Sequence, residues 1–299
     1  MIACTTSTGF VGYAPAKLNL FFEIHGKRSD GYHDVCSLCC PISVFDTLIV
    51  EPLESPEIVF SCTHGGIAQT AGNIPTGAEN LVVKAVELIR KRYGVPGGCR
   101  IRLIKRIPSQ AGMGGGSSDA ATAMRLVCKV WNLRIAFGEM LKLASELGSD
   151  VPMFFFNGLT LGLGRGELIE PLGPAPRLDF VVVKPPEGVS TAEAFRAFAA
   201  ERVRNHRTPE RLLKGLQSGD LREIRSGMFN RLETTARRLC PKIGQLREIF
   251  EKLDCPACQM TGSGTAYFAI CRNRRNACQL ASRWRWLGMG DVFVAHAVT

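Results

Sequence analysis

Pro108-Ser-Gln-Ala-Gly-Met-Gly-Gly-Gly-Ser-Ser118 lies between an alternating stretch (Ile101, Leu103, Lys105) and a run of apolar residues at helical spacing, Ala120 to Trp131. Glycines let the backbone adopt positive φ and let its N–H groups approach an anion closely. The helix that follows would direct its unpaired N–H groups at the same point. The stretch therefore predicts a phosphate-binding loop between a strand and a helix, with two serines that cap the helix or face the ligand.

Two widespread phosphate loops do not fit this stretch. A Walker A loop places lysine before its final Ser or Thr, whereas this loop has no lysine and Ser118 is followed by Asp119. The glycine spacing from Gly112 to Gly116 also differs from the G-x-G-x-x-G of dinucleotide-binding folds. A flexible glycine turn is the alternative, but the Ser-Ser pair and the amphipathic helix directly after the glycines favour a phosphate loop.

The chain has 299 residues, of which 45% are hydrophobic, and this is enough to bury a large core. Its length suits one large or two medium domains, and we expect two, over residues 1–170 and 171–299. No stretch is long and apolar enough to span a membrane, and the first residues lack the basic and apolar regions of a signal peptide. We therefore expect a soluble, cytoplasmic protein.

The charge of the chain is strongly basic, with 37 Lys and Arg against 27 Asp and Glu and a formal net charge of +10. Arginines crowd residues 196–252 and 272–285. A basic chain suits an anionic ligand, and nucleic acid is one candidate. The basic regions nevertheless lack the aromatic residues and spacings of common nucleic-acid-binding modules, and charged helix faces are usually solvated. We expect no nucleic-acid partner.

Twelve cysteines are scattered along the chain and include two C-x-x-C pairs, Cys36/Cys39 and Cys255/Cys258. A zinc site would require these two distant pairs to converge. Most other cysteines lie in apolar runs, where a free thiol behaves as a small hydrophobic group, and a chain of this size needs no disulfides. We predict reduced structural thiols.

Apolar periodicity and turn residues predict a mixture of strands and helices. The predicted strands cover 17–24, 47–51, 100–105, 178–184 and the regions around 267–270 and 292–295. One predicted helix begins at Asn80 and ends at Tyr93, before Gly94. A second follows the glycine loop and a third covers about 137–147, and arginine-rich helices are predicted in the second half. A glycine-spaced strand and turn is expected within 154–170, and Pro171-Leu-Gly-Pro-Ala-Pro176 is the expected linker.

Four segments together resemble the motifs of the GHMP kinases, the superfamily of galactokinase and of homoserine, mevalonate and phosphomevalonate kinases. They are Ala14-Pro-Ala-Lys-Leu-Asn-Leu20, Pro108 to Ser118, Leu147-Gly-Ser-Asp-Val-Pro-Met-Phe154 and Met260-Thr-Gly-Ser-Gly-Thr265. The resemblance covers nearly the whole chain. It implies the α+β, two-domain GHMP kinase fold, with an N-terminal nucleotide-binding domain, a C-terminal substrate domain and the active cleft between them.

Two further motifs, Arg28-Ser-Asp-Gly-Tyr-His33 and Pro186-Glu-Gly-Val-Ser-Thr191, resemble one branch of this family. That branch uses ATP to phosphorylate the 2-hydroxyl group of a small molecule, cytidyl diphospho-methylerythritol, in the non-mevalonate route to isoprenoid precursors. The resemblance implies this activity here, as a monomer or weak homodimer without a membrane partner. A homoserine-type or mevalonate-type kinase is the alternative within the family, and a basic nucleic-acid-binding protein is the alternative outside it.

The resemblance implies that Asp150 is the catalytic base and that Lys17 is its cationic partner. This agrees with the chemistry of phosphoryl transfer, in which a carboxylate accepts the hydroxyl proton and a cation stabilises the transferring phosphoryl group. Taken singly, Asp150 could instead cap a helix and Lys17 could be a solvated strand residue. The two residues gain weight from occurring together with the glycine loop.

The resemblance also implies the binding residues. For ATP these are Asn80, Val82, Lys105, Pro108, Ser109, Gln110, Ala111, Gly112, Met113, Gly114, Gly115, Gly116, Ser117 and Ser118. For the substrate they are Asn19, Tyr32, His33, Thr191, Phe195, Gly262 and Ser263, with the cytosine stacked between Tyr32 and Phe195 and read by His33. Because no cluster of Asp and Glu marks a metal site, Mg²⁺ is expected to bind together with ATP. Ser117 and Ser118 are its candidate ligands.

Three positions depart from the family pattern. Gln110-Ala111 stands where some members have further glycines, and Met153-Phe154 matches a common Pro-Phe-Phe pattern only in part. Arg231, within Asn230-Arg-Leu-Glu233, stands where members usually have Asp. These departures concern the fine geometry of the site rather than its class.

Overall fold

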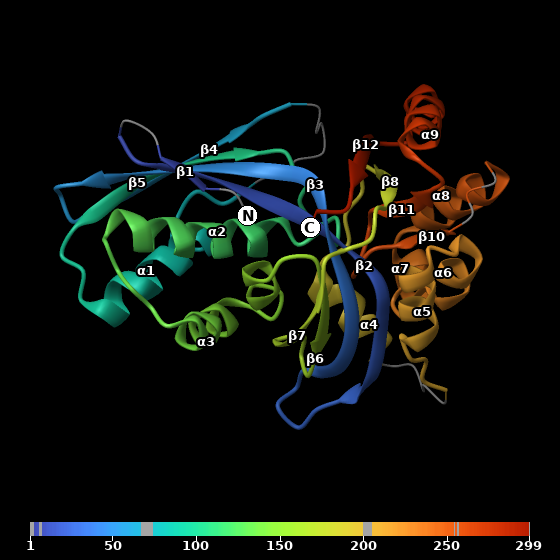
Figure 1. Cartoon of the computed structure of the whole chain (residues 1–299), viewed down its shortest axis with the longest axis horizontal. Coiled ribbons are helices and arrows are strands. Elements are labelled where there is room, and N and C mark those ends of the chain that lie inside the picture. The colour runs from blue at the N-terminus through green and yellow to red at the C-terminus, as the bar shows by residue number, and fades with distance from the viewer. Residues whose placement is uncertain are drawn as a thin grey trace. The chain divides into compact units, whose positions relative to one another are not determined.

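The computed structural model describes residues 3–5, 8–66, 74–199, 205–253, 255 and 257–298. The chain divides into two compact units, each built from separate segments (Figure 1). The first unit comprises Met1–Ala16, Val44–Ile107 and Gly114–Phe156, and the second comprises Lys17–Ser43, Pro108–Met113 and Asn157–Thr299. The predicted boundary between residues 170 and 171 stays a prediction. Arg202 and Arg204, in the first arginine-rich region, lie outside the described residues.

A twisted sheet forms one layer of the first unit. Its strands are β1 (Ala3–Thr5), the first part of β2 (Phe10–Lys27), the last part of β3 (His33–Leu53), β5 (Gly98–Lys105) and β4 (Ile58–His64). β3 pairs antiparallel with β5, with Thr47 opposite Ile104, and β4 pairs parallel with β5. Burial alternates along β5, so Ile101, Leu103 and Lys105 share the inner face, as the sequence pattern predicts.

Helices cover one face of this sheet (Figure 1). They are α1 (Leu81–Tyr93), α2 (Gly115–Val130), α3 (Phe137–Leu147) and the short 3₁₀ helix η1 (Pro152–Phe155). The predicted ends of α1 and α3 are confirmed: Gly94 ends α1 in the left-handed conformation, and Gly148 follows α3. α2 packs directly on β2, because a Cβ atom at Gly12 would lie 2.7 Å from Cγ2 of Thr122.

The second unit contains the remaining halves of β2 and β3. β6 (Leu159–Leu163) pairs antiparallel with β3, β7 (Leu168–Gly173) pairs antiparallel with β6, and β9 (Phe229–Asn230) pairs parallel with β2. A separate antiparallel sheet has the order β10 (Ala257–Met260), β11 (Tyr267–Cys271), β8 (Asp179–Lys184) and β12 (Asp291–His296). The predicted closing strands are therefore confirmed, and β8 lies between them.

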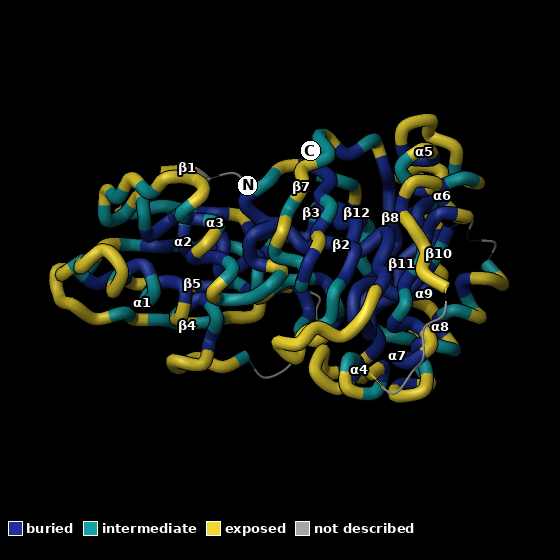
Figure 2. The backbone as a smooth tube through the Cα atoms, turned by 90° about the horizontal axis from the view of Figure 1, so that it is seen from below, coloured by how far each residue is buried: buried dark blue, intermediate teal, exposed yellow. Residues whose placement is uncertain are grey.

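Helices of the second unit pack on that sheet and on one another. They are α4 (Thr191–Phe198), α5 (Glu210–Ser218), α6 (Leu221–Gly227), α7 (Glu233–Leu239), α8 (Pro241–Lys252) and α9 (Arg274–Leu287). The ring of Phe250 in α8 lies 4.5 Å from Trp284 in α9 and 5.3 Å from Tyr267 in β11, centroid to centroid. Figure 2 shows β8 and β11 buried along their whole length. Mixed helices and sheets in both units confirm the predicted α+β class.

The predicted linker over 171–176 is wrong for its first half. Pro171 and Gly173 belong to β7 and lie opposite Thr160 and Leu159 of β6. Pro171 cannot donate a ladder hydrogen bond, but β7 pairs only with β6 among the described strands, so its other edge needs no donor. Proline and glycine here mark an edge strand rather than a connection.

In the part of the chain that the structure describes, no helix combines the length and the apolar character that crossing a bilayer would require.

Candidate active site

The glycine loop begins with residues held in left-handed conformations. Gly112 has φ 71° and Gly114 has φ 68°, where glycine carries no steric cost. Gly112 also permits a close backbone contact, because a Cβ atom there would lie 2.1 Å from the carbonyl oxygen of Thr261. Gln110 has φ 50° although it is not glycine, a conformation that side-chain-bearing residues rarely adopt.

Helix α2 begins earlier than the apolar spacing indicates. Gly114 is its N-cap, and no side chain caps it, so Ser117 and Ser118 do not act as caps. Gly115, Gly116 and Ser117 form the first turn, whose N–H groups have no acceptor within the helix. Oγ of Ser118 is buried without a hydrogen-bond partner among the described residues. This end of α2 thus offers several unpaired polar groups to an anion and its counterion.

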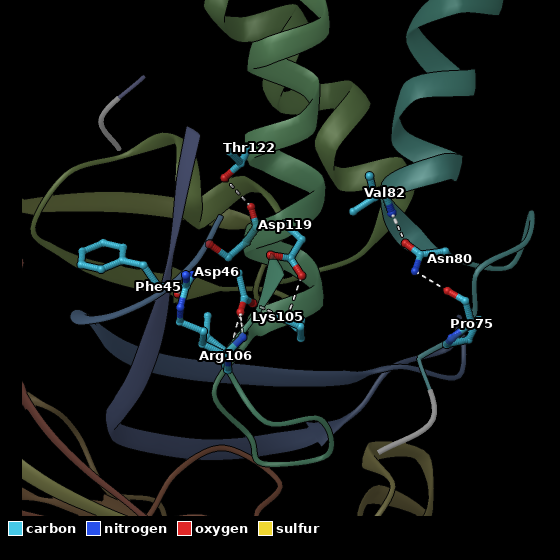
Figure 3. A network of polar contacts seen from close by, with 11 residues as sticks. Phe45, Asp46, Pro75, Asn80, Val82, Lys105, Arg106, Asp119 and Thr122 are labelled. Atoms are coloured by element: carbon cyan, nitrogen blue, oxygen red, sulfur yellow. Dashed lines mark hydrogen bonds and ion pairs between the residues drawn. The ribbon is translucent and has the colours of Figure 1, made fainter. Parts of the chain in front are cut away.

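A buried ion cluster fixes the approach to α2 (Figure 3). Nζ of Lys105, at the end of β5, donates to Asp46 of β3 and, at 2.7 Å, to Asp119 of α2. The other carboxylate oxygen of Asp46 accepts the N–H groups of Arg106 and Ile107. Asp46 therefore holds the chain where it enters the glycine loop, and Lys105 links that point to the first turns of α2.

Burial and the ion pairs act in opposite directions on the pKa values in this cluster. Burial raises the pKa of Asp119, against the opposing effect of the Lys105 charge. Burial lowers the pKa of Lys105, but the Asp119 and Asp46 carboxylates raise it above its usual value, so the ammonium persists. The ammonium of Lys105 thus lies between two buried carboxyl groups, and this pairing makes its burial tolerable.

The two glycines at the start of α2 provide a matched pair for testing the loop. A Cβ atom at Gly115 would lie 2.8 Å from Nζ of Lys105, whereas nothing lies within 4 Å of one at Gly116. We expect Gly116→Ala to keep or raise the free energy of unfolding, by up to about 1 kcal/mol, because alanine favours a helix. The same methyl group would stand in the approach of a phosphate to the helix end, so KM for ATP should rise about tenfold or more.

Gly115→Ala is the control for this experiment. Its Cβ would displace Lys105 and Ile107, so we expect a loss of stability of about 1–3 kcal/mol by denaturant titration. A folded Gly116→Ala protein with unchanged KM for ATP would show that no phosphate approaches the helix here.

Asn80 and Val82, which are predicted to lie near the adenosine, are hydrogen-bonded to each other at the start of α1. Asn80 Oδ1 accepts the N–H of Val82 at 2.8 Å, and Asn80 Nδ2 donates to the carbonyl of Pro75 at 2.6 Å (Figure 3). The side chain of Val82 is buried. Asn80 is thus the helix cap, and its nucleotide contact stays a prediction.

In the second unit, three predicted segments meet around β2. The N–H of Lys17 donates to the carbonyl of Met113 at 2.9 Å, and Nζ of Lys17 donates to Oδ1 of Asn19. The N–H of Asn19 donates to Oγ1 of Thr261 at 2.9 Å. Lys17, Asn19, the glycine loop and the segment after β10 therefore form one cluster, in which Lys17 is almost fully buried at 3% exposure.

The segment after β10 also contacts the predicted substrate residues. The N–H groups of Thr265 and Ala266 donate to the carbonyls of Gln110 and Ala111, both at 3.2 Å. The hydroxyls of Ser263 and Thr191 are hydrogen-bonded at 2.9 Å. The structure thus brings Ser263 and Thr191 together beside the loop that carries Gly262.

The three predicted base-binding residues differ in their surroundings. The ring of His33 lies 5.1 Å from that of Phe195, whereas Tyr32 is 52% exposed and its ring lies under the guanidinium of Arg165 at 4.6 Å. Burial lowers the pKa of His33, and the charge of Lys27 lowers it further, so the imidazole is neutral. A neutral imidazole beside an aromatic ring can exchange hydrogen bonds with a heterocyclic base.

Asp150 lies in the first unit, in the turn between α3 and η1, and is exposed. The N-cap position of η1 is Val151. The roles of Asp150 as a catalytic base and, in the alternative, as a helix cap both stay predictions.

Comparison with known proteins identifies the family. The model of the GHMP kinase N-terminal domain matches residues 80–158, and that of the GHMP kinase C-terminal domain matches residues 212–286. A 4-diphosphocytidyl-2-C-methyl-D-erythritol kinase of Pelotomaculum thermopropionicum is 38% identical over 91% of this chain and 92% of its own length. One from Bacillus pumilus is 34% identical over 86% of each chain. The chain belongs to the 4-diphosphocytidyl-2-C-methyl-D-erythritol kinases of the GHMP family.

Solved structures of GHMP kinases support this assignment. The crystal structure of a 4-(cytidine 5′-diphospho)-2C-methyl-D-erythritol kinase has a TM-score of 0.80 and 32% identity, and the match covers 97% of this chain and 99% of that one. A homoserine kinase from Cytophaga hutchinsonii has a TM-score of 0.74 at 18% identity, covering 100% and 97%. At that identity the homoserine kinase shows the shared GHMP fold alone.

Several polar residues of this GHMP kinase were not predicted from the sequence. Asp46 and Asp119 hold Lys105, Thr261 holds Asn19, and Arg165 covers Tyr32. Asp119 directly follows the Ser-Ser pair, so its position next to a predicted phosphate site was the available signal. Asp46 and Arg165 lie in ordinary strand and turn contexts, and only the tertiary structure reveals their partners.

The cysteines of the kinase are thiols, as predicted. None of the twelve, all of which lie in the described residues, forms a disulfide, and burial raises the pKa of Cys99 to about 12 and of Cys128 to about 11. Within the described ranges, no group of three or more His, Cys, Asp or Glu side chains is placed to hold a metal ion.

Proposed function

We propose that this GHMP kinase transfers the γ-phosphoryl group of ATP to the 2-hydroxyl group of 4-diphosphocytidyl-2-C-methyl-D-erythritol, on the non-mevalonate route to isoprenoid precursors. The observation that carries the proposal is the 38% identity with a kinase of that name over nine-tenths of both chains. The cluster of Lys17, Asn19 and the Thr261–Gly262 backbone supports it with a buried cation beside polar groups.

The chain's own residues would divide the work as follows. The N–H groups at the start of α2 and in the glycine loop would bind phosphate oxygens. Those of the first turn have no acceptor within the helix and lie at the positive end of the helix dipole. Lys17 would stabilise negative charge on the transferring phosphoryl group, and Asp150 would accept the proton of the substrate hydroxyl. Positioning and charge stabilisation supply most of the catalysis in such a reaction.

Mg²⁺ fits the start of α2. The buried, unpartnered Oγ of Ser118 is an oxygen donor of the kind that Mg²⁺ prefers, and Ser117 lies one residue before it. The ion would neutralise charge on the phosphates of ATP. We propose Ser117 or Ser118 as the residue that would hold it.

The base pocket separates the proposed substrate from those of related kinases. If Tyr32 and Phe195 stack on the cytosine, truncation of either to Ala should weaken substrate binding by about 1–3 kcal/mol and leave ATP affinity unchanged. His33→Ala should instead reduce the discrimination between cytidyl and uridyl substrates, because it removes a group that reads the base edge. Steady-state kinetics with both substrates measure these effects.

A purely structural role of Tyr32, His33 and Phe195 would change the kinetic constants in a different way. If these residues serve only the fold, the KM values for substrate and for ATP would change together with stability. An unchanged KM for the cytidyl substrate in folded Tyr32→Ala and Phe195→Ala proteins would contradict the pocket.

A substrate panel tests the function directly. The pure protein is incubated with MgATP and, separately, 4-diphosphocytidyl-2-C-methyl-D-erythritol, homoserine, mevalonate and phosphomevalonate, and ADP release is measured. We expect turnover of the first alone. Turnover of another panel member would overturn the proposal.

The remaining parts of the proposal concern the setting of the enzyme. We infer a cytoplasmic enzyme, active as a monomer or weak homodimer, that binds no nucleic acid. Salt-sensitive binding to random RNA without ATP turnover would contradict this inference and favour a nucleic-acid-binding protein.

A further inference from the structure

Asn230 lies at the end of β9, directly before the position where Arg231 departs from the family pattern. β9 pairs parallel with β2, with Phe22 opposite Asn230. The side chain of Asn230 is buried, with 7% of the residue exposed. A buried amide requires partners for both of its ends, so the partners of Asn230 indicate its role.

The side-chain amide of Asn230 is hydrogen-bonded to the residues before and after Thr261. Its Nδ2 donates to the carbonyl of Met260 at 2.8 Å and to that of Gly262 at 2.9 Å. Its Oδ1 accepts the N–H of Leu232 at 3.0 Å. The amide orientation follows from these partners, because two carbonyls can only accept and an N–H can only donate.

The backbone that Asn230 holds lies against the buried cation. A Cβ atom at Gly262 would lie 3.2 Å from Nζ of Lys17 and 3.1 Å from Oδ1 of Asn19, and Gly262 has φ 54°. The hydroxyl group of Thr261 accepts the backbone N–H of Asn19 and donates to Oδ1 of the same residue. Lys17 and Asn19 therefore contact one side of this short segment, and Asn230 fixes its carbonyls.

Glu233 lies in the same segment, Asn230-Arg-Leu-Glu233, but contacts different parts of the fold. Its carboxylate accepts the N–H of Met260 and the hydroxyl of Tyr267, both at 3.2 Å, and pairs with Arg247. These contacts hold β10 and β11 rather than Gly262. Asn230 and Glu233 thus allow the stability of the sheet to be separated from the position of the segment that follows it.

We propose that Asn230 is a positioning residue for phosphoryl transfer: it holds the Thr261–Gly262 backbone in place and thereby fixes Lys17 and Asn19 at the acceptor hydroxyl group. The proposal rests on the proposed function for the identity of the reaction, but its geometry is independent of the substrate. Asn230 itself touches no reacting atom.

Asn230→Asp is the sharpest test. It keeps the size of the side chain and the acceptor for Leu232, but it replaces the donor with an oxygen that faces two carbonyls. We expect kcat/KM for the acceptor substrate to fall about 10- to 100-fold, because small displacements near reacting groups are costly, while KM for ATP stays within about threefold. Asn230→Ser keeps one donor and should lose less activity.

Two controls accompany these variants. Glu233→Gln should lower the melting temperature and leave the kinetics of the folded protein unchanged. Asn273→Asp makes the same chemical change at the N-cap of α9, where a carboxylate also caps, and should affect neither.

The outcomes separate the two proposals. Unchanged kinetics in folded Asn230→Asp, or KM values that drift together with stability as expected of a structural residue, would overturn the positioning role. If Asn230→Asp does not fold, the kinetics of Asn230→Ser decide. If the unmodified protein fails to phosphorylate 4-diphosphocytidyl-2-C-methyl-D-erythritol, the proposed function is wrong, whatever the variants do.

Discussion

Asp150→Asn is expected to lower kcat by about 10²- to 10⁴-fold and to leave KM for ATP nearly unchanged. Asparagine keeps the volume of the side chain but cannot accept the proton of the attacking hydroxyl group. Asp150 is exposed and lies in the turn after α3, so the exchange should leave the fold intact. Steady-state kinetics, with circular dichroism to verify folding, measure the effect.

The control for this variant is Asp220→Asn. Asp220 is an exposed aspartate whose Oδ1 caps α6 through the N–H of Arg222, and asparagine can make the same bond. It should turn over substrate like the unmodified protein. Turnover of Asp150→Asn within a few fold of normal would exclude Asp150 as the base.

Lys105→Met is expected to destabilise the protein by about 3–5 kcal/mol, because it leaves the carboxylate of Asp46 buried without its cation. Both side chains are almost fully buried, at 6% and 0% exposure, so water cannot replace the ammonium. Equilibrium denaturation at pH 7 measures the loss. The Asp46→Asn, Lys105→Met double variant should recover part of it, since asparagine carries no charge and still accepts the N–H groups of Arg106 and Ile107.

Arg211→Ala is the matched control for an ion pair on the surface. Arg211 and Glu223 are 58% and 44% exposed, so water screens their pair and its loss should change the stability little. A similarly small loss for Lys105→Met would contradict the assignment of Asp46, Lys105 and Asp119 as a buried ionic link.

Local signals in the sequence predicted much of the fold. α1 and α3 were delimited correctly because Asn80, Gly94 and Gly148 act through their neighbours in the chain, and β5 because its burial alternates. The start of α2 was placed too late because glycines are poor helix formers, and only the tertiary setting makes Gly115 and Gly116 helical. Pro171 and Gly173 resembled a linker because an edge strand tolerates the same residues.

The candidate site was predicted unevenly for a similar reason. Motifs identified Lys17, Asn19 and the glycine loop, which the structure joins through Met113 and Thr261. The positions of Asp46 and Asn230 depend on partners far along the chain, and a single sequence does not show such pairs. The hydrogen bonds from Asn230 to Met260 and Gly262 connect residues about thirty positions apart.

The interleaving of the two units has a consequence for biosynthesis. The first unit has all its segments once residue 156 has been translated, whereas the second requires β12, which ends at His296. At about 5–20 residues per second, a ribosome needs roughly 7–30 s to translate the residues between these two positions. For about the first half of that time Phe21, which is fully buried in the finished enzyme, lacks its partner strand β9. The nascent chain is therefore most prone to aggregation after its N-terminal half is complete, and we expect that half to depend on chaperones until the C-terminal half emerges.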